Sequence, residues 1–212
     1  MQIATIGALA LYAFVMSITP GPNNMLLANA GLVFGFRSTI PQIVGIPTGV
    51  ISQILLVSAG LSSLFAQIPS IQLALKVAGT FYLLWLALKL WKADALAQSP
   101  NATPISFSQA LLFQFINPKS RLIALTAVSA FLQPEKAVLP QLLIICFAFA
   151  LIGTPCMAVW SAMGSALRRH LSSPASLRRA NRTLAALASA TCIMFWLRRW
   201  TRHAKRIRCL IW

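Results

Sequence analysis

The chain has almost no acidic residues. Among its 212 residues, Asp94 and Glu135 are the only carboxylate side chains, and charged residues of both signs make up 9%. Soluble domains usually carry about 25% charged residues, so this composition excludes an ordinary water-exposed surface. Both acidic residues fall between apolar segments, which excludes an intramembrane carboxylate as a proton carrier. Their absence from the apolar segments also favours a neutral amino acid as a ligand over a dibasic one such as lysine.

Groups that could form a catalytic or metal site are scarce. His170 and His203 lie in basic stretches, and the four cysteines (Cys146, Cys156, Cys192 and Cys209) show no CxxC spacing. An intramembrane enzyme needs a base, a nucleophile or a metal set within mutual reach. Neither an Asp pair nor a Ser/His pair lies within an apolar segment. The sequence therefore predicts no enzyme, no metal site and no cofactor.

Six apolar segments dominate what is present. Hydrophobic residues make up 58% of the chain, and the segments cover about residues 3–19, 40–65, 71–91, 108–132, 139–163 and 183–197. Segments near 20 residues cross a bilayer as helices, which satisfy their own backbone groups. We expect an all-α polytopic membrane bundle that forms one domain over 1–212. The first segment is expected to be a membrane span and not a cleaved signal peptide. The sixth segment reaches only about 22 Å, short of the roughly 30 Å hydrocarbon core, so whether it crosses is left open.

The basic residues predict the orientation. The net charge is +16, and the positive-inside rule explains it better than nucleic-acid binding, which we do not expect. The connections after segments one, three and five hold eight basic residues: Arg37, Lys89, Lys92, Arg168, Arg169, Arg178, Arg179 and Arg182. Those after segments two and four hold two, Lys76 and Lys136. The odd-numbered loops are therefore predicted in the cytoplasm and the N-terminus outside. The basic tail 198–212 breaks this pattern, unless the chain crosses only five times.

Proline and glycine interruptions recur in the two halves of the chain. Segments one and four carry TPGPN at 19–23 and NPK at 117–119, while segments two and five carry GIPTG at 45–49 and IGTPC at 152–156. This suggests repeats over 1–92 and 105–197. Because each has three segments, the second would enter the membrane from the opposite side. Paired interruptions in an inverted repeat indicate a transporter's binding site.

These interruptions supply the candidate substrate-binding residues. A proline in a helix removes one amide donor and frees a carbonyl. Freed carbonyls can bind an ammonium group, and a new helix N-terminus can bind a carboxylate, so a zwitterionic amino acid suits both. The candidates are Thr19, Pro20, Gly21, Pro22, Asn23, Asn24, Gly45, Pro47, Gly49, Asn117, Pro118, Lys119, Gly153 and Pro155. The alternative is that the prolines only kink helices for packing.

Lys119 is the most informative charge. If the fourth span began after Arg121, the residues up to the QPEK turn would reach only about 17 Å, too short to cross. The span must therefore include Asn117, Pro118 and Lys119. Intramembrane cations are functional candidates, and a substrate carboxylate is the natural partner in a chain with so few of its own. The alternative is that Lys119 and Arg121 extend to the membrane interface.

Several of these motifs together resemble the LysE/RhtB family of amino-acid exporters. They are TPGPNN (19–24), GFR (35–37), GIPTG (45–49), AGTFYLLWLALKLW (78–91) and PISFSQALLFQFINPKS (104–120). The closest motif match is to the cysteine/O-acetylserine exporter branch. The resemblance implies six helices, efflux from the cytoplasm through the bacterial inner membrane, and proton antiport. The family motif falls on Thr19, Pro20, Gly21, Pro22, Asn23, Gly35, Gly45, Gly49, Asn117, Pro118 and Lys119.

The C-terminus departs from the family pattern. FWLRRWTRHAKRIRCLIW is short and basic where relatives carry an apolar helix, and we interpret it as the product of a frameshift or an altered stop. Arg121 also departs from the small or apolar residue expected after NPK. With its tail set aside, the chain is predicted to export small neutral amino acids or derivatives, such as cysteine, O-acetylserine, homoserine or threonine. Alternating access would bring 19–24 and 117–119 together near the midplane. The alternative is a non-transporting membrane assembly or structural component; self-association is left open.

Overall fold

The computed structural model describes residues 1–61, 103–133 and 135–170, and the single positions 77, 81, 179, 183 and 186. Apart from those positions, the expected segments 71–91 and 183–197 and the tail 198–212 lie outside the described residues. The described ranges contain helices and no strand, which confirms the all-α prediction. The helices are α1 (Ile3–Ile18), α2 (Pro22–Phe34), η1 (Arg37–Thr39), α3 (Ile40–Leu56), η2 (Val57–Leu61), α7 (Phe107–Ile116), α8 (Pro118–Phe131), α9 (Val138–Ala148), η3 (Phe149–Gly153) and α10 (Thr154–His170).

The first apolar segment breaks where its prolines predict. α1 ends because Thr19 precedes Pro20 and is extended, at φ −64° and ψ 140°. Gly21 is also extended, and Pro22 then occupies the first turn of α2, a position at which its missing N–H is not needed. The axes of α1 and α2 differ by 54°. The helix from Pro22 to Phe34 continues beyond the expected segment, so the break lies inside a longer bent element.

The fourth segment breaks in the same way. α7 begins with a capping box, in which the Ser106 hydroxyl accepts a hydrogen bond from the Gln109 amide and the Gln109 side chain accepts one from the Ser106 amide. It ends at Asn117, which precedes Pro118 and is extended. The Asn117 side chain then caps α8 by accepting a hydrogen bond from the Lys119 amide. The NPK sequence lies at the break between α7 and α8.

The expected interruptions at Pro47 and Pro155 take a different form. α3 runs through Pro47 without ending, so the predicted interruption of the second segment at GIPTG is wrong. A proline inside a helix removes one amide donor, but the hydrogen bonds on both sides hold the helix together. In the fifth segment the irregularity is the π-helical turn Phe149–Gly153, and Pro155 follows it in the first turn of α10. The whole element Val138–Arg168 counts as one span of 31 residues.

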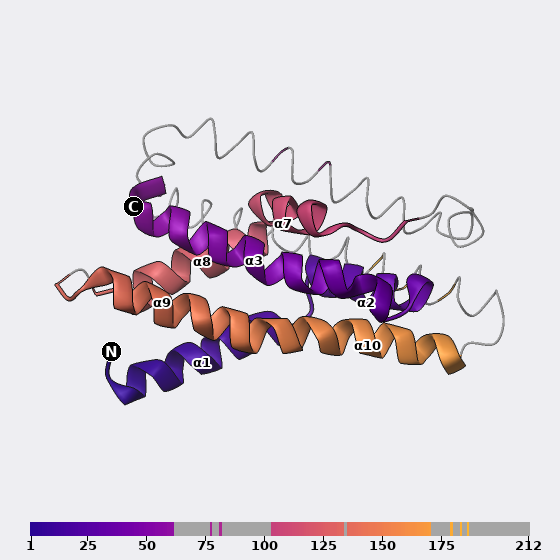
Figure 1. Ribbon diagram of the computed structural model, residues 1–212, viewed down its shortest axis with the longest axis horizontal. Coiled ribbons are helices and arrows are strands. Elements are labelled where there is room, and N and C mark those ends of the chain that lie inside the picture. Colours follow the sequence, from indigo (N-terminus) through magenta and orange to yellow (C-terminus); the bar gives the residue numbers. More distant parts are fainter. Residues whose placement is uncertain are drawn as a thin grey trace, which may run out of the picture.

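The helices form one elongated bundle (Figure 1). α2 lies along α10, while α3 lies along α7 and contacts α8. At the right-hand end of Figure 1 the chain turns from α2 into α3, enters α7 and leaves α10. The Arg168 guanidinium lies near Gly35 at this end. The N-terminus and the turn between α8 and α9 lie at the opposite end, so α3 and α7 run in one direction and α9–α10 in the other.

Small residues bring the paired helices together. Gly31 of α2 and Gly164 of α10 lie so close to the partner helix that a Cβ on either would overlap a backbone carbonyl. A Cβ on Gly45 or Gly49 of α3 would lie 2.7 or 2.6 Å from a carbonyl oxygen of α7. Membrane helices commonly pack through such residues, because lipid supplies no hydrophobic force between helices.

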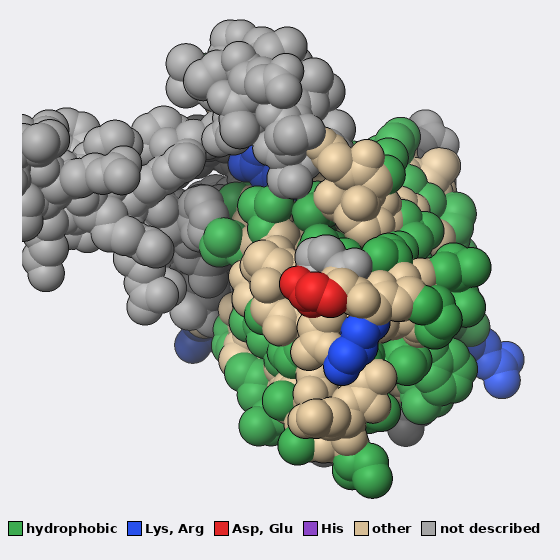
Figure 2. All heavy atoms as spheres, turned by 90° about the vertical axis from the view of Figure 1, so that its left-hand side faces the viewer, with side chains coloured by type: hydrophobic (Ala, Val, Ile, Leu, Met, Phe, Trp, Pro, Cys, Tyr) green, Lys and Arg blue, Asp and Glu red, His purple; other side chains and the backbone are tan. Residues whose placement is uncertain are grey.

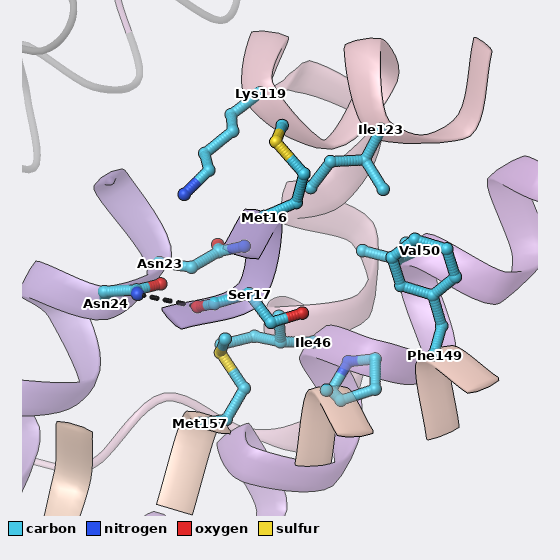
Figure 3. Close-up of a pocket in the computed structure, with 12 residues that line it drawn as sticks. Met16, Ser17, Asn23, Asn24, Ile46, Val50, Lys119, Ile123, Phe149 and Met157 are labelled. Atoms are coloured by element: carbon cyan, nitrogen blue, oxygen red, sulfur yellow. Dashed lines mark hydrogen bonds between the residues drawn. The ribbon is translucent and has the colours of Figure 1, made fainter. Parts of the chain in front are cut away.

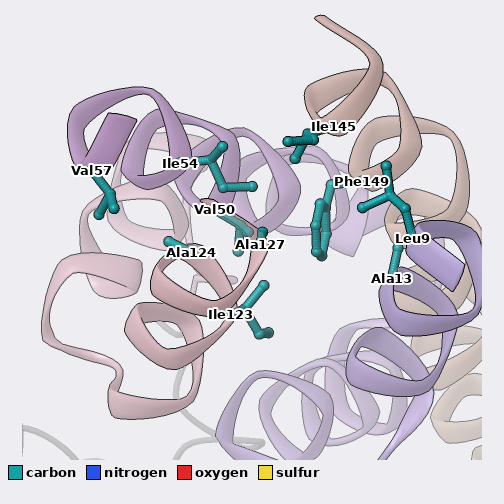
Figure 4. Packing of buried hydrophobic residues seen from close by; sticks show 10 residues of the cluster. All are labelled: Leu9, Ala13, Val50, Ile54, Val57, Ile123, Ala124, Ala127, Ile145 and Phe149. Carbon is teal, nitrogen blue, oxygen red and sulfur yellow. The ribbon is translucent and has the colours of Figure 1, made fainter. Parts of the chain in front are cut away.

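A cluster of buried apolar side chains packs between the helices (Figure 4). It joins α1, α3, η2, α8, α9 and η3 through Leu9, Ala13, Val50, Ile54, Val57, Ile123, Ala124, Ala127, Ile145 and Phe149. The flanks are hydrophobic as well, and in the end-on view of Figure 2 an acidic and a basic side chain lie side by side on the end that faces the viewer. Among the described residues, two helices are long and apolar enough to cross a membrane, or three if α1 and α2 form one broken span.

Candidate functional site

The two helix breaks meet inside the bundle. The Lys119 ammonium donates hydrogen bonds to the Thr19 carbonyl oxygen at 2.7 Å and to the Thr19 hydroxyl at 3.1 Å. Gly21 makes room for this side chain, because a Cβ there would lie 2.9 Å from Lys119 Cδ and 3.1 Å from its Nζ. The TPGP and NPK motifs, far apart in the sequence, therefore form one local structure.

Asn24 satisfies the carbonyls at the end of α1. Its Nδ2 lies 2.9 Å from the Ser17 carbonyl oxygen and 3.0 Å from that of Thr19. The Trp160 indole donates to the Ile18 carbonyl oxygen at 3.0 Å. The last carbonyls of a helix have no partner within it and need donors from elsewhere. The carbonyls at this break are therefore not without partners, because the protein's own side chains donate to them.

Asn23 joins the two breaks through a second set of hydrogen bonds. Its Nδ2 donates to Gln114 Oε1 at 2.9 Å, and Gln114 Nε2 donates back to Asn23 Oδ1 at 3.2 Å. Gln114 Oε1 also accepts from the Ser120 hydroxyl at 2.6 Å, and the Gln114 carbonyl accepts from Gln53 Nε2 at 2.6 Å. Sequence reasoning missed Gln53, Gln114 and Ser120. Uncharged amides within apolar segments were the available signal, since buried polar groups need partners.

A small cavity lies beside these contacts (Figure 3). Its volume is about 30 Å³, which is room for about two water molecules. Figure 3 shows the Lys119 side chain extending toward Asn23 and Asn24. The lining residues are Met16, Ser17, Asn23, Asn24, Ile46, Pro47, Val50, Lys119, Ile123, Phe149, Gly153 and Met157. An amino acid is several times larger than a water molecule, so binding one requires this cavity to widen.

The structure assigns the expected site residues to different places. Five line the cavity: Asn23, Asn24, Pro47, Lys119 and Gly153. Six form or cap the breaks around it: Thr19, Pro20, Gly21, Pro22, Asn117 and Pro118. The remaining three do not line it: Gly45 and Gly49 pack against α7, and Pro155 lies in the first turn of α10.

The charges around the cavity favour an anion. Lys119 lies in the first turn of α8, where the helix dipole disfavours a cation. It also approaches the N-terminus of α2, which has no side-chain cap at Gly21. Glu135 is the one acidic side chain in the described ranges, and it is exposed in the turn between α8 and α9. A carboxylate ligand would therefore meet a lysine and an open helix N-terminus.

The same chain matches a known family over most of its length. The family model described as LysE type translocator matches residues 14–198. This chain belongs to the LysE type translocator family. A cysteine/O-acetylserine efflux protein of Salmonella typhimurium is 33% identical over 159 residues, covering 74% of this chain and 81% of the relative. A protein of the same name from Escherichia coli strain K12 is 32% identical over 170 residues, covering 80% and 87%. No solved structure matches.

Membership in the LysE type translocator family confirms the resemblance predicted from TPGPNN and NPK. These relatives are amino-acid efflux transporters and not enzymes. Together with the apolar helices, the family indicates a protein of the bacterial inner membrane.

Proposed function

We propose that this protein exports small neutral amino acids or their derivatives, of the cysteine and O-acetylserine class, from the bacterial cytoplasm. The observation that carries the proposal is Lys119, a partly buried cation at the meeting point of two helix breaks and beside a cavity. Homoserine and threonine belong to the same size class. The efflux activity in the names of the relatives supports this choice.

The substrate carboxylate replaces Thr19 as the partner of Lys119. A hydrogen bond between two charged groups is roughly twice as strong as one between neutral groups, so a carboxylate competes well with a backbone carbonyl. When the Lys119 ammonium leaves Thr19, one of the contacts between the α1–α2 break and α8 is lost. Substrate binding thereby loosens the contact between the breaks, which is the step that alternating access requires.

The cavity lining accounts for a small and neutral substrate side chain. Met16, Ile46, Phe149 and Met157 present apolar surface, and methionine adapts to groups of different shape. A basic substrate side chain would meet Lys119 with no carboxylate among the lining residues to offset the repulsion. A thiol or an acetyl ester suits this lining better.

The arrangement of segments supports two exchangeable halves. α2, which follows segment one, packs on α10 of segment five, and α3 of segment two packs on α7 of segment four. If segments one and two of the first half are matched with segments four and five of the second, the pair one and five corresponds to the pair four and two. The part of segments one and four that makes the contact differs between the two pairs. We assign the end that carries Arg37 and Arg168 to the cytoplasm, because positive residues gather there. By resemblance, a proton is the coupling ion.

Export assays on Lys119 variants test the proposal. In inverted membrane vesicles, Lys119→Ala should reduce uptake of labelled O-acetylserine by about 10- to 100-fold, the loss expected for a charged hydrogen bond. Lys119→Arg should retain part of the activity because it keeps the charge. Lys136→Ala, in the exposed turn, is the matched control and should export normally. Normal export by Lys119→Ala at equal membrane levels would remove Lys119 from the site, and no export by the wild type would favour a non-transporting component.

A further inference from the structure

The proposed export function leaves the ammonium group of the substrate without a binding partner. Near Lys119 the ammonium would be repelled. The carbonyl oxygens of Ser17 and Ile18 already accept from Asn24 and Trp160, and that of Thr19 still accepts from Asn24 after Lys119 has turned to the substrate. An ammonium taken out of water needs acceptors, because burying it without them costs several kcal/mol. A buried oxygen that no group of the protein already uses is therefore a better acceptor for it.

A second cavity lies next to the first, between α2, α3 and α7. Its volume is about 10 Å³, room for one group of the size of water. It is lined by Asn23, Leu26, Gln42, Ile46, Ile105, Gln109, Ala110 and Phe113. Asn23 and Ile46 line both cavities, so these two side chains form the boundary between them. Figure 3 shows both residues at the larger cavity.

Gln42, at the wall of this second cavity, carries an unsatisfied acceptor. Its side chain is 1% exposed, and its Oε1 has no hydrogen-bond partner. Within the described residues, Gln53 Oε1 is the other buried side-chain oxygen without a hydrogen-bond partner, but Gln53 lines neither of the two cavities. The remaining unsatisfied atom, Asn117 Nδ2, is a donor and cannot bind an ammonium. A buried oxygen without a partner is costly, so an N–H group that reaches this oxygen gains a strong interaction.

The position of Gln42 suits a substrate that enters from the cytoplasm. Gln42, Ile46 and Val50 lie four residues apart on one face of α3, which runs from the second cavity to the first over about 12 Å. Gln42 is in the first turn of α3, close to the connection that carries Arg37. Ile105, which precedes α7, and Gln109, in its first turn, also line this cavity.

We propose that the Gln42 carboxamide oxygen accepts the ammonium N–H of the exported amino acid, in a subsite between α2, α3 and α7 that precedes the Lys119 cavity. The small volume fits an ammonium head and not a whole amino acid. The subsite selects substrates that carry a free amino group. It also explains how a chain with no carboxylate at either cavity recognises the positive end of a zwitterion.

The test compares two isomers in inverted vesicles. O-acetylserine carries an ammonium, whereas N-acetylserine has the same atoms with a neutral amide in its place. Uptake of labelled O-acetylserine is measured at mildly acidic pH, where the isomers do not interconvert, with either unlabelled isomer as competitor. The wild type should be inhibited at least about tenfold more effectively by O-acetylserine. Gln42→Met should lower uptake at low substrate concentration by about tenfold and bring the competition ratio of the two isomers close to one.

Two further variants keep the test decisive. Gln42→Glu, which offers a charged acceptor, should preserve or widen the preference for O-acetylserine, even if Gln42→Met does not fold. Thr48 lies on the same helix and lines neither cavity, and its hydroxyl donates to the Val44 carbonyl. Thr48→Val removes this hydroxyl and should keep the wild-type competition ratio of the two isomers. If Gln42→Met kept the wild-type competition ratio of the two isomers, the cavity would hold only water and the inference would be wrong. A competition ratio closer to one in Gln42→Glu than in the wild type would also overturn it.

The outcomes for the wild type separate this inference from the proposed function. A wild type that transports O-acetylserine but does not distinguish the isomers refutes the Gln42 subsite alone. A wild type that transports no amino acid refutes the export function, and the subsite with it.

Discussion

Replacing Gln114 by leucine should weaken the contact between the two helix breaks more than the loss of one hydrogen bond would. The Gln114 side chain is completely buried and uses both amide hydrogens and its oxygen. It exchanges two hydrogen bonds with Asn23, accepts one from Ser120 and donates one to the Ala110 carbonyl. Leucine has a similar size but no polar atoms. The Asn23 amide and the Ser120 hydroxyl would therefore remain buried without their partner.

The size of the effect follows from these contacts. Each buried polar group left without a partner costs about 1–3 kcal/mol, partly recovered by relaxation, so Gln114→Leu should cost about 2–4 kcal/mol. Hydrogen bonds between membrane helices contribute about 0.6 kcal/mol each on average and about 1.7 kcal/mol at most. For the two bonds between Asn23 and Gln114, we expect a coupling free energy of about 1–2 kcal/mol. The double variant Asn23→Leu/Gln114→Leu should therefore lose less free energy of unfolding than the two single variants lose together.

A double-mutant cycle measures this coupling. The free energy of unfolding is obtained for the wild type, both single variants and the double variant by titrating purified protein in mild detergent micelles with dodecyl sulfate. Gln109→Leu is the control on the same helix, since Gln109 is exposed and should lose only the hydrogen bond that its side chain accepts from the Ser106 amide, about 1 kcal/mol. Single losses that add to the double loss within about 0.5 kcal/mol would show that Asn23 and Gln114 do not stabilise each other.

Two further stability predictions use the same titration. Gly31→Val should lower the free energy of unfolding by about 1–3 kcal/mol or more, because its Cβ would overlap the backbone of α10 at Ser161. Gly7→Val is the control and should be neutral, since nothing lies within 4 Å of a Cβ there. Equal stabilities of the two variants would mean that α2 and α10 are not packed this closely. Asn24→Leu should cost about 1–2 kcal/mol, because the Ser17 and Thr19 carbonyls lose its amide. Wild-type stability in this variant would show that those carbonyls do not depend on Asn24.

The helix breaks were predictable because their causes are local. A residue before proline avoids the helical conformation, and Thr19 and Asn117 are both extended as this rule requires. The same reasoning failed at Pro47, where the helix continues. A single missing amide does not decide whether a helix ends. The packing of the residues on both sides does, and Gly45 and Gly49 hold this part of α3 tightly against α7.

The partners of the polar groups were not predictable in the same way. The sequence indicated that Lys119 needed a partner and that carbonyls would be freed near Pro20. It did not show that Lys119 binds the Thr19 carbonyl, nor that Asn24 and Trp160 fill the others. It also gave no sign that Gln42 would bring an unsatisfied oxygen to a cavity. These pairings join residues from different helices, and such distances are set only by packing.

The amino-acid sequence by itself determined the class of protein, the positions of the two breaks and the family, because hydrophobicity, proline chemistry and motif spacing are properties of the chain alone. The tertiary structure decided which polar atoms are satisfied and which are not. That difference arises because a hydrogen bond depends on a few tenths of an ångström between groups that only the packed helices bring together.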